Sequence, residues 1–184
     1  MIAPKLWCME KLIWKGDKGK AEHWVIELKY LDDQLRLLRR MVMKYRSDPF
    51  IRNLAVKIIR EAECAPKDMR SQALAVATHV QNNVFYVQEL PERFQTPVET
   101  LQRKAGDCDD FTATIAALNE SIGIPTLFIV MSIDGGWKHI FPAANVGKKG
   151  LLTLDATLDK SIHQLVNPVN WARARGHKVL IKVA

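Results

Sequence analysis

The sequence has few cysteines, and they lie far apart. Cys8, Cys64 and Cys108 are the three in 184 residues, and no CxxC pair occurs. An odd number of distant cysteines argues against a disulfide framework, and their spacing argues against a zinc site. Each thiol therefore has to be judged by its own surroundings, and we expect Cys8 and Cys64 to be inert core thiols.

Long apolar runs are also missing. No stretch of 18 or more apolar residues occurs, which argues against a membrane-spanning helix. The first twenty residues carry charges throughout and have no small-residue cleavage site, so they do not match a secretory signal peptide. We therefore expect a cytoplasmic protein, or one that leaves the cell inside an assembled particle such as a virion.

Acidic residues are in deficit. The chain has 27 Lys and Arg against 20 Asp and Glu, and the resulting net charge of +7 comes mainly from residues 1–70. Such an excess suits an anionic partner such as nucleic acid, an acidic protein or a cell-wall polymer. No basic stripe with interleaved aromatics supports nucleic acid in particular, so a solvated helical surface is the simpler explanation.

Residues 1–66 are expected to form an N-terminal arm and a helical extension. Residues 5–15 are apolar with scattered charges and lead into a Gly- and Lys-rich turn, which indicates a hairpin arm. This part of the chain is the candidate surface for assembly partners.

Two helices are expected to follow the arm. Apolar residues at heptad-like spacing over 25–45 predict the first helix, although residues 24–30 also alternate as in a strand. Asp32 is a candidate N-cap for this helix. Asp48 followed by Pro49 predicts the start of the second helix, because proline is favoured at the first helical position.

Residues 67–184 begin with helices and end with strands. The pattern predicts helices over 68–83, 97–104, 108–121 and 170–175, and extended segments over 84–87, 126–133, 137–146, 151–157 and 178–183. Gly123 and Pro125 end the helix that begins at Cys108. Helices followed by antiparallel strands predict an α+β fold.

Cys108 lies where a nucleophilic thiol is favoured. Helix N-termini stabilise a thiolate through free N–H groups and the macrodipole, and Gly106 permits a sharp entry into the helix. Asp107, Asp109 and Asp110 oppose this effect, because neighbouring negative charge disfavours a thiolate. We interpret these carboxylates as serving the helix N-terminus, with a calcium site as the weaker alternative, so a histidine must stabilise the thiolate.

His139 and Asp155 are the candidate partners of Cys108. They are sixteen residues apart, on two predicted strands joined by the turn at 147–150. Hairpin strands lie side by side, so Asp155 is expected to accept a hydrogen bond from one ring nitrogen of His139 and to fix its tautomer.

Three runs of the sequence resemble the transglutaminase-like superfamily, which has a papain-like fold. They are VETLQRKAGDCDDFTATIAALNESIGIPTLFIV, WKHIFPAANV and LLTLDAT, preceded by NNVFYV. The resemblance covers about residues 70–160. The resemblance implies a catalytic core at 67–184, with a Cys at a helix start packed on an antiparallel sheet that carries His and Asp.

The resemblance also implies an activity. Cys108 would attack an amide or ester carbonyl, His139 would act as base and then acid, and Asp155 would orient His139. The substrate would be a protein or peptide, cleaved or exchanged at an amide bond, with no cofactor and no metal. Prokaryotic and phage relatives are more often similar to peptidases or amidases than to protein cross-linkers.

Other site residues are less defined by the sequence. Gln81, Asn82 and Asn83 are alternatives for the side-chain oxyanion donor that the family places upstream of the cysteine, with Gln81 and Asn83 preferred. Trp137 is a candidate wall of the substrate cleft.

Two other functions stay open. One is a structural or binding component, for example of a phage particle, that keeps the fold without turnover. The weaker one is nucleic-acid binding through Arg36, Arg39 and Arg40.

Overall fold

A computed structural model describes residues 9–17, 20–28, 30–88, 93–157 and 167–184, the first two segments as backbone alone. The helices are α1 (Leu31–Tyr45), α2 (Pro49–Glu61), α3 (Met69–Asn83), α4 (Pro97–Arg103), α5 (Cys108–Ser121) and α6 (Pro168–Ala174), with a short 3-10 helix, η1, at Gly147–Lys149. The strands are β1 (Met9–Asp17), β2 (Lys20–Leu28), β3 (Phe85–Tyr86), β4 (Ala105–Gly106), β5 (Thr126–Ile133), β6 (Gly136–Asn145), β7 (Leu151–Thr153) and β8 (Val179–Val183).

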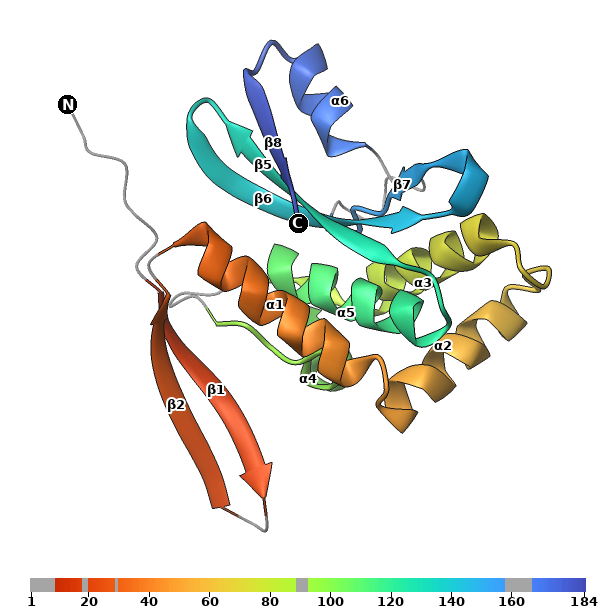
Figure 1. Cartoon of the computed structure of the whole chain (residues 1–184), viewed down its shortest axis with the longest axis horizontal. Helices are drawn as coiled ribbons and strands as arrows, with labels where there is room; N and C mark the ends of the chain where they lie inside the picture. Colours follow the sequence, from red (N-terminus) through yellow and green to blue (C-terminus); the bar gives the residue numbers. More distant parts are fainter. Residues whose placement is uncertain (1–8, 18–19, 29, 89–92, 158–166) are drawn as a thin grey trace.

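The architecture is an antiparallel sheet between two unequal helical layers. The sheet has the order β7-β6-β5-β8, with every neighbouring pair antiparallel. Figure 1 shows α1, α2, α3 and α5 on one face and α6 on the other. The predicted α+β fold is therefore confirmed.

Helix α5 lies at the centre of the helical layer. Every residue from Asp109 to Asn119 is buried, because α1, α2, α3, α4 and β6 all pack around it. One apolar cluster joins α5 to α2 and α3, and a second joins it to α1 and to the sheet through Leu38, Phe128 and Ile140. Burial on this scale makes α5 a rigid support for whatever lies at its first residue.

The N-terminal segment forms the expected hairpin. β1 and β2 pair antiparallel over their whole length, and Figure 1 shows them projecting away from the helices beyond the start of α1. The strand alternative for residues 24–30 was correct as far as Leu28, and the helix begins only at Leu31. The division of the chain after residue 66 stays a prediction.

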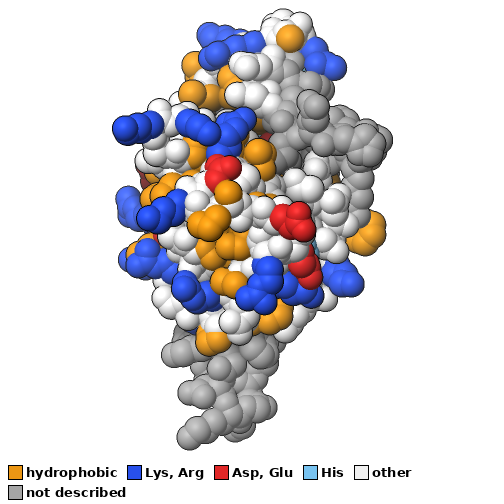
Figure 2. Space-filling view, turned by 90° about the vertical axis from the view of Figure 1, so that its right-hand side faces the viewer, with side chains coloured by type: hydrophobic (Ala, Val, Ile, Leu, Met, Phe, Trp, Pro, Cys, Tyr) orange, Lys and Arg blue, Asp and Glu red, His pale blue; other side chains and the backbone are white. Residues whose placement is uncertain are grey.

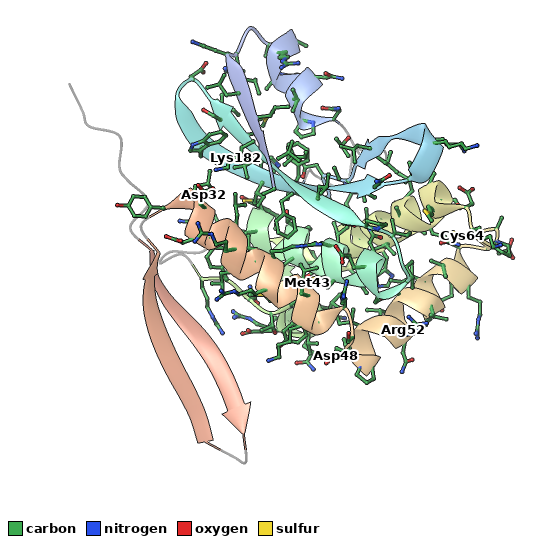
Figure 3. All side chains as sticks on the ribbon, in the orientation of Figure 1. Asp32, Met43, Asp48, Arg52, Cys64 and Lys182 are labelled. Atoms are coloured by element: carbon green, nitrogen blue, oxygen red, sulfur yellow. The ribbon has the colours of Figure 1, made fainter. Side chains whose placement is uncertain are left out.

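The proposed N-cap at Asp32 is wrong. Tyr30 occupies the N-cap position of α1 and makes no side-chain capping bond, so Asp32 falls within the first turn. There it pairs with Lys182 on β8, as Figure 3 shows. This ion pair holds the pKa of the Asp32 carboxyl below its ordinary value through a hydrogen bond and charge attraction from Lys182. Asp32 therefore forms a tertiary ion pair instead of the capping hydrogen bond that the local sequence suggested.

Helices α2 and α3 begin where the sequence predicts, and each is capped by an aspartate. Asp48 accepts hydrogen bonds from the Phe50 and Ile51 N–H groups at 2.8 and 3.3 Å, with Pro49 at the first helical position. Asp68, predicted as the first residue of its helix, is the N-cap of α3. Each carboxylate satisfies N–H groups that the first helical turn leaves without a partner.

Basic side chains are scattered over one face of the molecule (Figure 2). Figure 2 shows Lys and Arg in several separate places on the face that carries α2 and α3, with apolar side chains between them. Arg39 of α1 and Arg46, the C-cap of this helix, form ion pairs with the carboxylate of Glu120, whose side chain is 6% exposed. Part of the basic excess therefore fastens α1 to the C-terminal end of α5.

Candidate active site

A reciprocal pair of aspartates builds the N-terminus of α5. Asp107 is the N-cap, in an extended conformation, and its side chain accepts from the Asp109 N–H at 3.3 Å. The Asp110 carboxylate accepts from the Asp107 N–H at 3.3 Å, which completes a capping box. The helix therefore begins at Cys108, which is partly exposed.

Asp110 has a second role that the sequence did not reveal. Its two carboxylate oxygens accept from the backbone N–H of Gln95 at 2.6 Å and from Gln95 Nε2 at 2.9 Å, and both side chains are fully buried. Gln95 Nε2 also lies 3.1 Å from the Ala105 carbonyl oxygen. The segment before α4 is thereby fastened to the turn that leads into Cys108.

The side chain of Asp110 lies so close to Gly106 that position 106 has no room for a Cβ atom. A Cβ atom added there would lie 2.8 Å from Asp110 Cβ and 2.9 Å from Asp110 Oδ2. Real Cβ atoms essentially never approach other atoms this closely, and the Asp110 carboxylate cannot move away without losing its hydrogen bonds. The sequence prediction gave Gly106 a turn-forming role, whereas the structure shows that it makes room for the capping carboxylate.

Three buried carboxylates gather beside Cys108. Oxygens of Asp107, Asp109 and Asp110 lie within 4.8 Å of one another, a grouping that could hold a metal ion. A cation there would have to compete with the backbone N–H groups that Asp107 and Asp110 already accept from. These bonds are the ones that a capping role requires.

His139 and Asp155 are in direct contact. His139 Nε2 lies 2.6 Å from Asp155 Oδ2, and the Asp155 side chain is 1% exposed against 18% for His139. The other carboxylate oxygen of Asp155 accepts from the N–H and the hydroxyl of Thr157, at 3.1 and 2.8 Å. The imidazole also stacks on Phe141, with ring centroids 5.6 Å apart.

These contacts set the tautomer of His139. A carboxylate only accepts hydrogen bonds, so Asp155 favours the tautomer in which Nε2 carries the proton. Nδ1 then has the free lone pair and is the ring nitrogen able to accept a proton. Because Thr157 and Phe141 hold Asp155 and the imidazole in place, the orientation of Nδ1 is set by the fold.

The strand predicted over 151–157 is shorter than expected. β7 ends at Thr153, so Asp155 follows the strand and does not lie within it. The Leu154 N–H still donates to the Pro142 carbonyl oxygen at 2.9 Å, which keeps the chain along β6 for one more residue. Pairing along β6 therefore delivers Asp155 to His139 even though regular strand pairing has ended.

Thr112 links the Cys108 helix to the histidine strand. Its hydroxyl oxygen lies 2.7 Å from the carbonyl oxygen of Cys108 and 3.2 Å from that of Ile140, the residue after His139. Both carbonyl oxygens are thus within hydrogen-bonding distance of one hydroxyl. The first turn of α5 therefore lies against β6 at the position of His139.

The remaining predicted residues lie near this region with different surroundings. Trp137 is on β6, two residues before His139, and is 39% exposed. Gln81 is buried in the last turn of α3, whereas Asn83 is exposed and its side-chain amide donates to the His79 carbonyl oxygen at 2.8 Å. The roles assigned to these three residues stay predictions.

The other cysteines differ in what can be said of them. Cys64 lies in the turn between α2 and α3 and is partly exposed, so it is not the core thiol that we expected. Cys8 lies outside the described residues.

The comparison with protein families identifies the chain. The model of the Transglutaminase-like superfamily matches residues 52–162, a span that contains Cys108, His139 and Asp155. Because this match covers more than half of the sequence, the chain belongs to the transglutaminase-like superfamily. A search of curated proteins found no match.

Solved structures share the fold. The chain is similar to a "Putative Cysteine Protease" from Cytophaga hutchinsonii, with 20% identity and a TM-score of 0.53 over 80% of this chain and 53% of that one. It is also similar to a "putative protease" from Parabacteroides distasonis, with 12% identity and a TM-score of 0.54 over 77% of this chain and 30% of that one. The chain thus spans about half of the first structure and less than a third of the second.

Within the described ranges, no helix combines the length and the apolar composition needed to cross a bilayer.

Proposed function

We propose that this protein is a cysteine hydrolase or acyltransferase that acts on an amide bond of a peptide or protein through Cys108, His139 and Asp155. The observation that carries the proposal is the hydrogen bond between His139 Nε2 and Asp155 Oδ2. His139 lies on β6, the strand against which the first turn of α5 packs. Membership of the transglutaminase-like superfamily supports it.

The first half of the reaction follows from the tautomer. His139 Nδ1 takes the proton of the Cys108 thiol, and Asp155 stabilises the resulting imidazolium. The thiolate then attacks the substrate carbonyl carbon and forms a tetrahedral intermediate with a negatively charged oxygen. The positive end of the α5 helix dipole favours that negative charge, and Gln81 and Asn83 are the candidate side-chain donors.

The second half releases both products. The intermediate collapses to a thioester on Cys108 when the carbon–nitrogen bond breaks, and the imidazolium gives its proton to the departing amine. Water, or a second amine, then attacks the thioester while His139 Nδ1 accepts its proton, and the carbon–sulfur bond breaks to release the acyl product and return Cys108 as the thiolate. The choice between these acceptors determines whether the protein hydrolyses or exchanges the amide bond. Trp137, exposed on the same strand as His139, is a candidate wall for the bound chain.

An activated ester tests the proposal without knowledge of the natural substrate. With p-nitrophenyl acetate, the wild type is expected to release a rapid burst of nitrophenol equivalent to the enzyme, followed by slower turnover, and intact mass should show one acetyl group on Cys108. Added methylamine should yield N-methylacetamide if an amine can serve as acceptor.

Two variants complete this test. Cys108→Ala should abolish the burst, whereas Cys64→Ala, which removes another partly exposed thiol, should keep it. A burst that survives in Cys108→Ala would refute the proposal. Full biological function of Cys108→Ala in its native setting would instead favour a component that keeps the fold without turnover.

A further inference from the structure

Three consecutive apolar side chains are exposed where α3 gives way to β3. Phe85, Tyr86 and Val87 are 61, 50 and 47% exposed, and we call these three residues the apolar strip. Most large apolar side chains of a folded domain are largely buried, so an exposed run of three calls for an explanation.

Backbone pairing places the apolar strip beside the entry to α5. β3 pairs in parallel with β4, and the Phe85 N–H donates to the Lys104 carbonyl oxygen at 2.8 Å. The Val87 N–H donates to the Gly106 carbonyl oxygen at 2.9 Å. Gly106 is two residues before Cys108, so the strip lies along β4, the segment that leads directly into the Cys108 helix.

Helix geometry then places Cys108 between the strip and the histidine strand. Successive residues of an α-helix are rotated by about 100°, so residues three and four positions after Cys108 lie on either side of it, one turn further along. The first of these is Phe111, whose ring centroid is 6.4 Å from that of Tyr86. The second is Thr112, whose hydroxyl reaches the Ile140 carbonyl oxygen. Tyr86 therefore lies on one side of the thiol and His139 on the other.

We propose that the apolar strip binds an apolar side chain of the peptide substrate within one residue of the bond to be cleaved or exchanged. This inference rests on the function proposed above. A chain bound between the strip and His139 would present its carbonyl to Cys108 and cover the ring of Tyr86. An apolar substrate side chain would bury apolar surface against the strip without giving up the hydration of a charge. A charged side chain would lose its hydration there, and the strip has no charged residue to pair with it.

Two electrophilic peptides test the specificity. Acetyl-Leu-Leu chloromethyl ketone and acetyl-Gly-Gly chloromethyl ketone carry the same reactive group. The Cys108 thiolate displaces the chloride of each, and the two rates of alkylation are measured by peptide mass spectrometry. The wild type should prefer the first by at least about tenfold, because a single methylene in an apolar pocket already discriminates by about 10- to 200-fold. Tyr86→Ser should bring the ratio of the two rates close to that of the free reagents with a small thiol, and Tyr86→Phe should retain the preference.

Tyr30→Ser is the matched control, since it removes a 70% exposed tyrosine at the start of α1 and should leave the ratio unchanged. Equal rates in the wild type, or an unchanged ratio in Tyr86→Ser, would overturn the inference and leave the proposed function intact.

Loss of both rates by the same factor in Tyr86→Ser would show that the ring only supports the fold around the thiol, which also overturns the inference. If neither reagent modifies Cys108 in the wild type, the proposed function falls as well. A dimer that Tyr86→Ser dissociates, seen by light scattering, would assign the strip to a second copy instead.

Discussion

His139 Nε2 and Asp155 Oδ2 lie 2.6 Å apart, and the carboxylate is almost completely buried. The other oxygen of Asp155 accepts two hydrogen bonds from Thr157, so the carboxylate is held from both ends. Because Nε2 is engaged with Asp155, only Nδ1 can exchange a proton with a thiol. The two ring nitrogens of His139 therefore differ in role: Nε2 binds Asp155, and Nδ1 accepts or donates the proton that is exchanged.

Replacement of Asp155 by asparagine should impair the chemistry more than the fold. The amide keeps the size of the side chain but can present N–H groups to Nε2, and the imidazole would then favour the wrong tautomer. We expect the acylation rate with p-nitrophenyl acetate to fall by about 10²- to 10⁴-fold, the usual contribution of a positioned acid–base group. Circular dichroism should show the wild-type secondary structure. A rate within twofold of the wild type would contradict the role of Asp155.

Gly106→Ala should destabilise the protein. The new Cβ would lie 2.8 Å from Asp110 Cβ, and overpacking of this kind costs about 1–3 kcal/mol of unfolding free energy. Gly136→Ala is the matched control, because its Cβ would meet only the flexible side chain of Lys138, at 3.3 Å. Urea unfolding of both variants measures the difference. Equal stability of the two would show that the turn into α5 adjusts freely.

Asp110→Ala should cost more stability than Asp48→Ala. Asp110 accepts from two N–H groups of Gln95 and from the Asp107 N–H, all away from solvent, and its loss would leave buried donors unsatisfied. We expect a loss of about 3 kcal/mol or more. Asp48 caps α2 nearer the surface, where loss of an N-cap costs about 1 kcal/mol. The order of the two urea midpoints is the test, and the reverse order would contradict the anchoring role of Asp110.

His79 should make stability depend on pH. Burial lowers the pKa of its imidazole below the ordinary value of 6.5, against a smaller opposing effect from Glu61. As the pH falls through 6.5 towards the lowered pKa, the unfolded chain binds a proton that the folded chain does not, so the free energy of unfolding decreases. His79→Gln should lose this part of the pH dependence. Urea unfolding at pH 7.5 and 5.5 compares the two proteins, and an identical decline in both would rule out His79 as a contributor.

The sequence was a good guide where the signals are local. Gly123 and Pro125 end α5 as predicted, and the strands over 126–133 and 137–146 appear within a residue of their expected bounds. Asp48 caps α2 because cap and helix are neighbours in the chain. Such signals depend on backbone groups within one turn, so they survive folding.

Contacts between distant segments were not predictable in the same way. Thr112 has no pattern that marks it as a link to β6, and Gln95 is fifteen residues from the carboxylate that holds it. The local sequence predicted Asp32 as an N-cap, but its carboxylate forms an ion pair with Lys182, 150 residues later in the chain. Such partners are decided by how α1, α5 and the sheet pack, which local propensity does not encode.

The most direct test of the account is the alkylation of Cys108 by iodoacetamide at neutral pH, followed by peptide mass spectrometry. Cys64 is also partly exposed and serves as the internal reference in the same sample. A thiol activated by His139 should react at least about tenfold faster than Cys64, and His139→Ala should reduce the rate at Cys108 to that of Cys64. Equal labelling of the two cysteines, or rapid labelling of Cys108 that persists in His139→Ala, would contradict it.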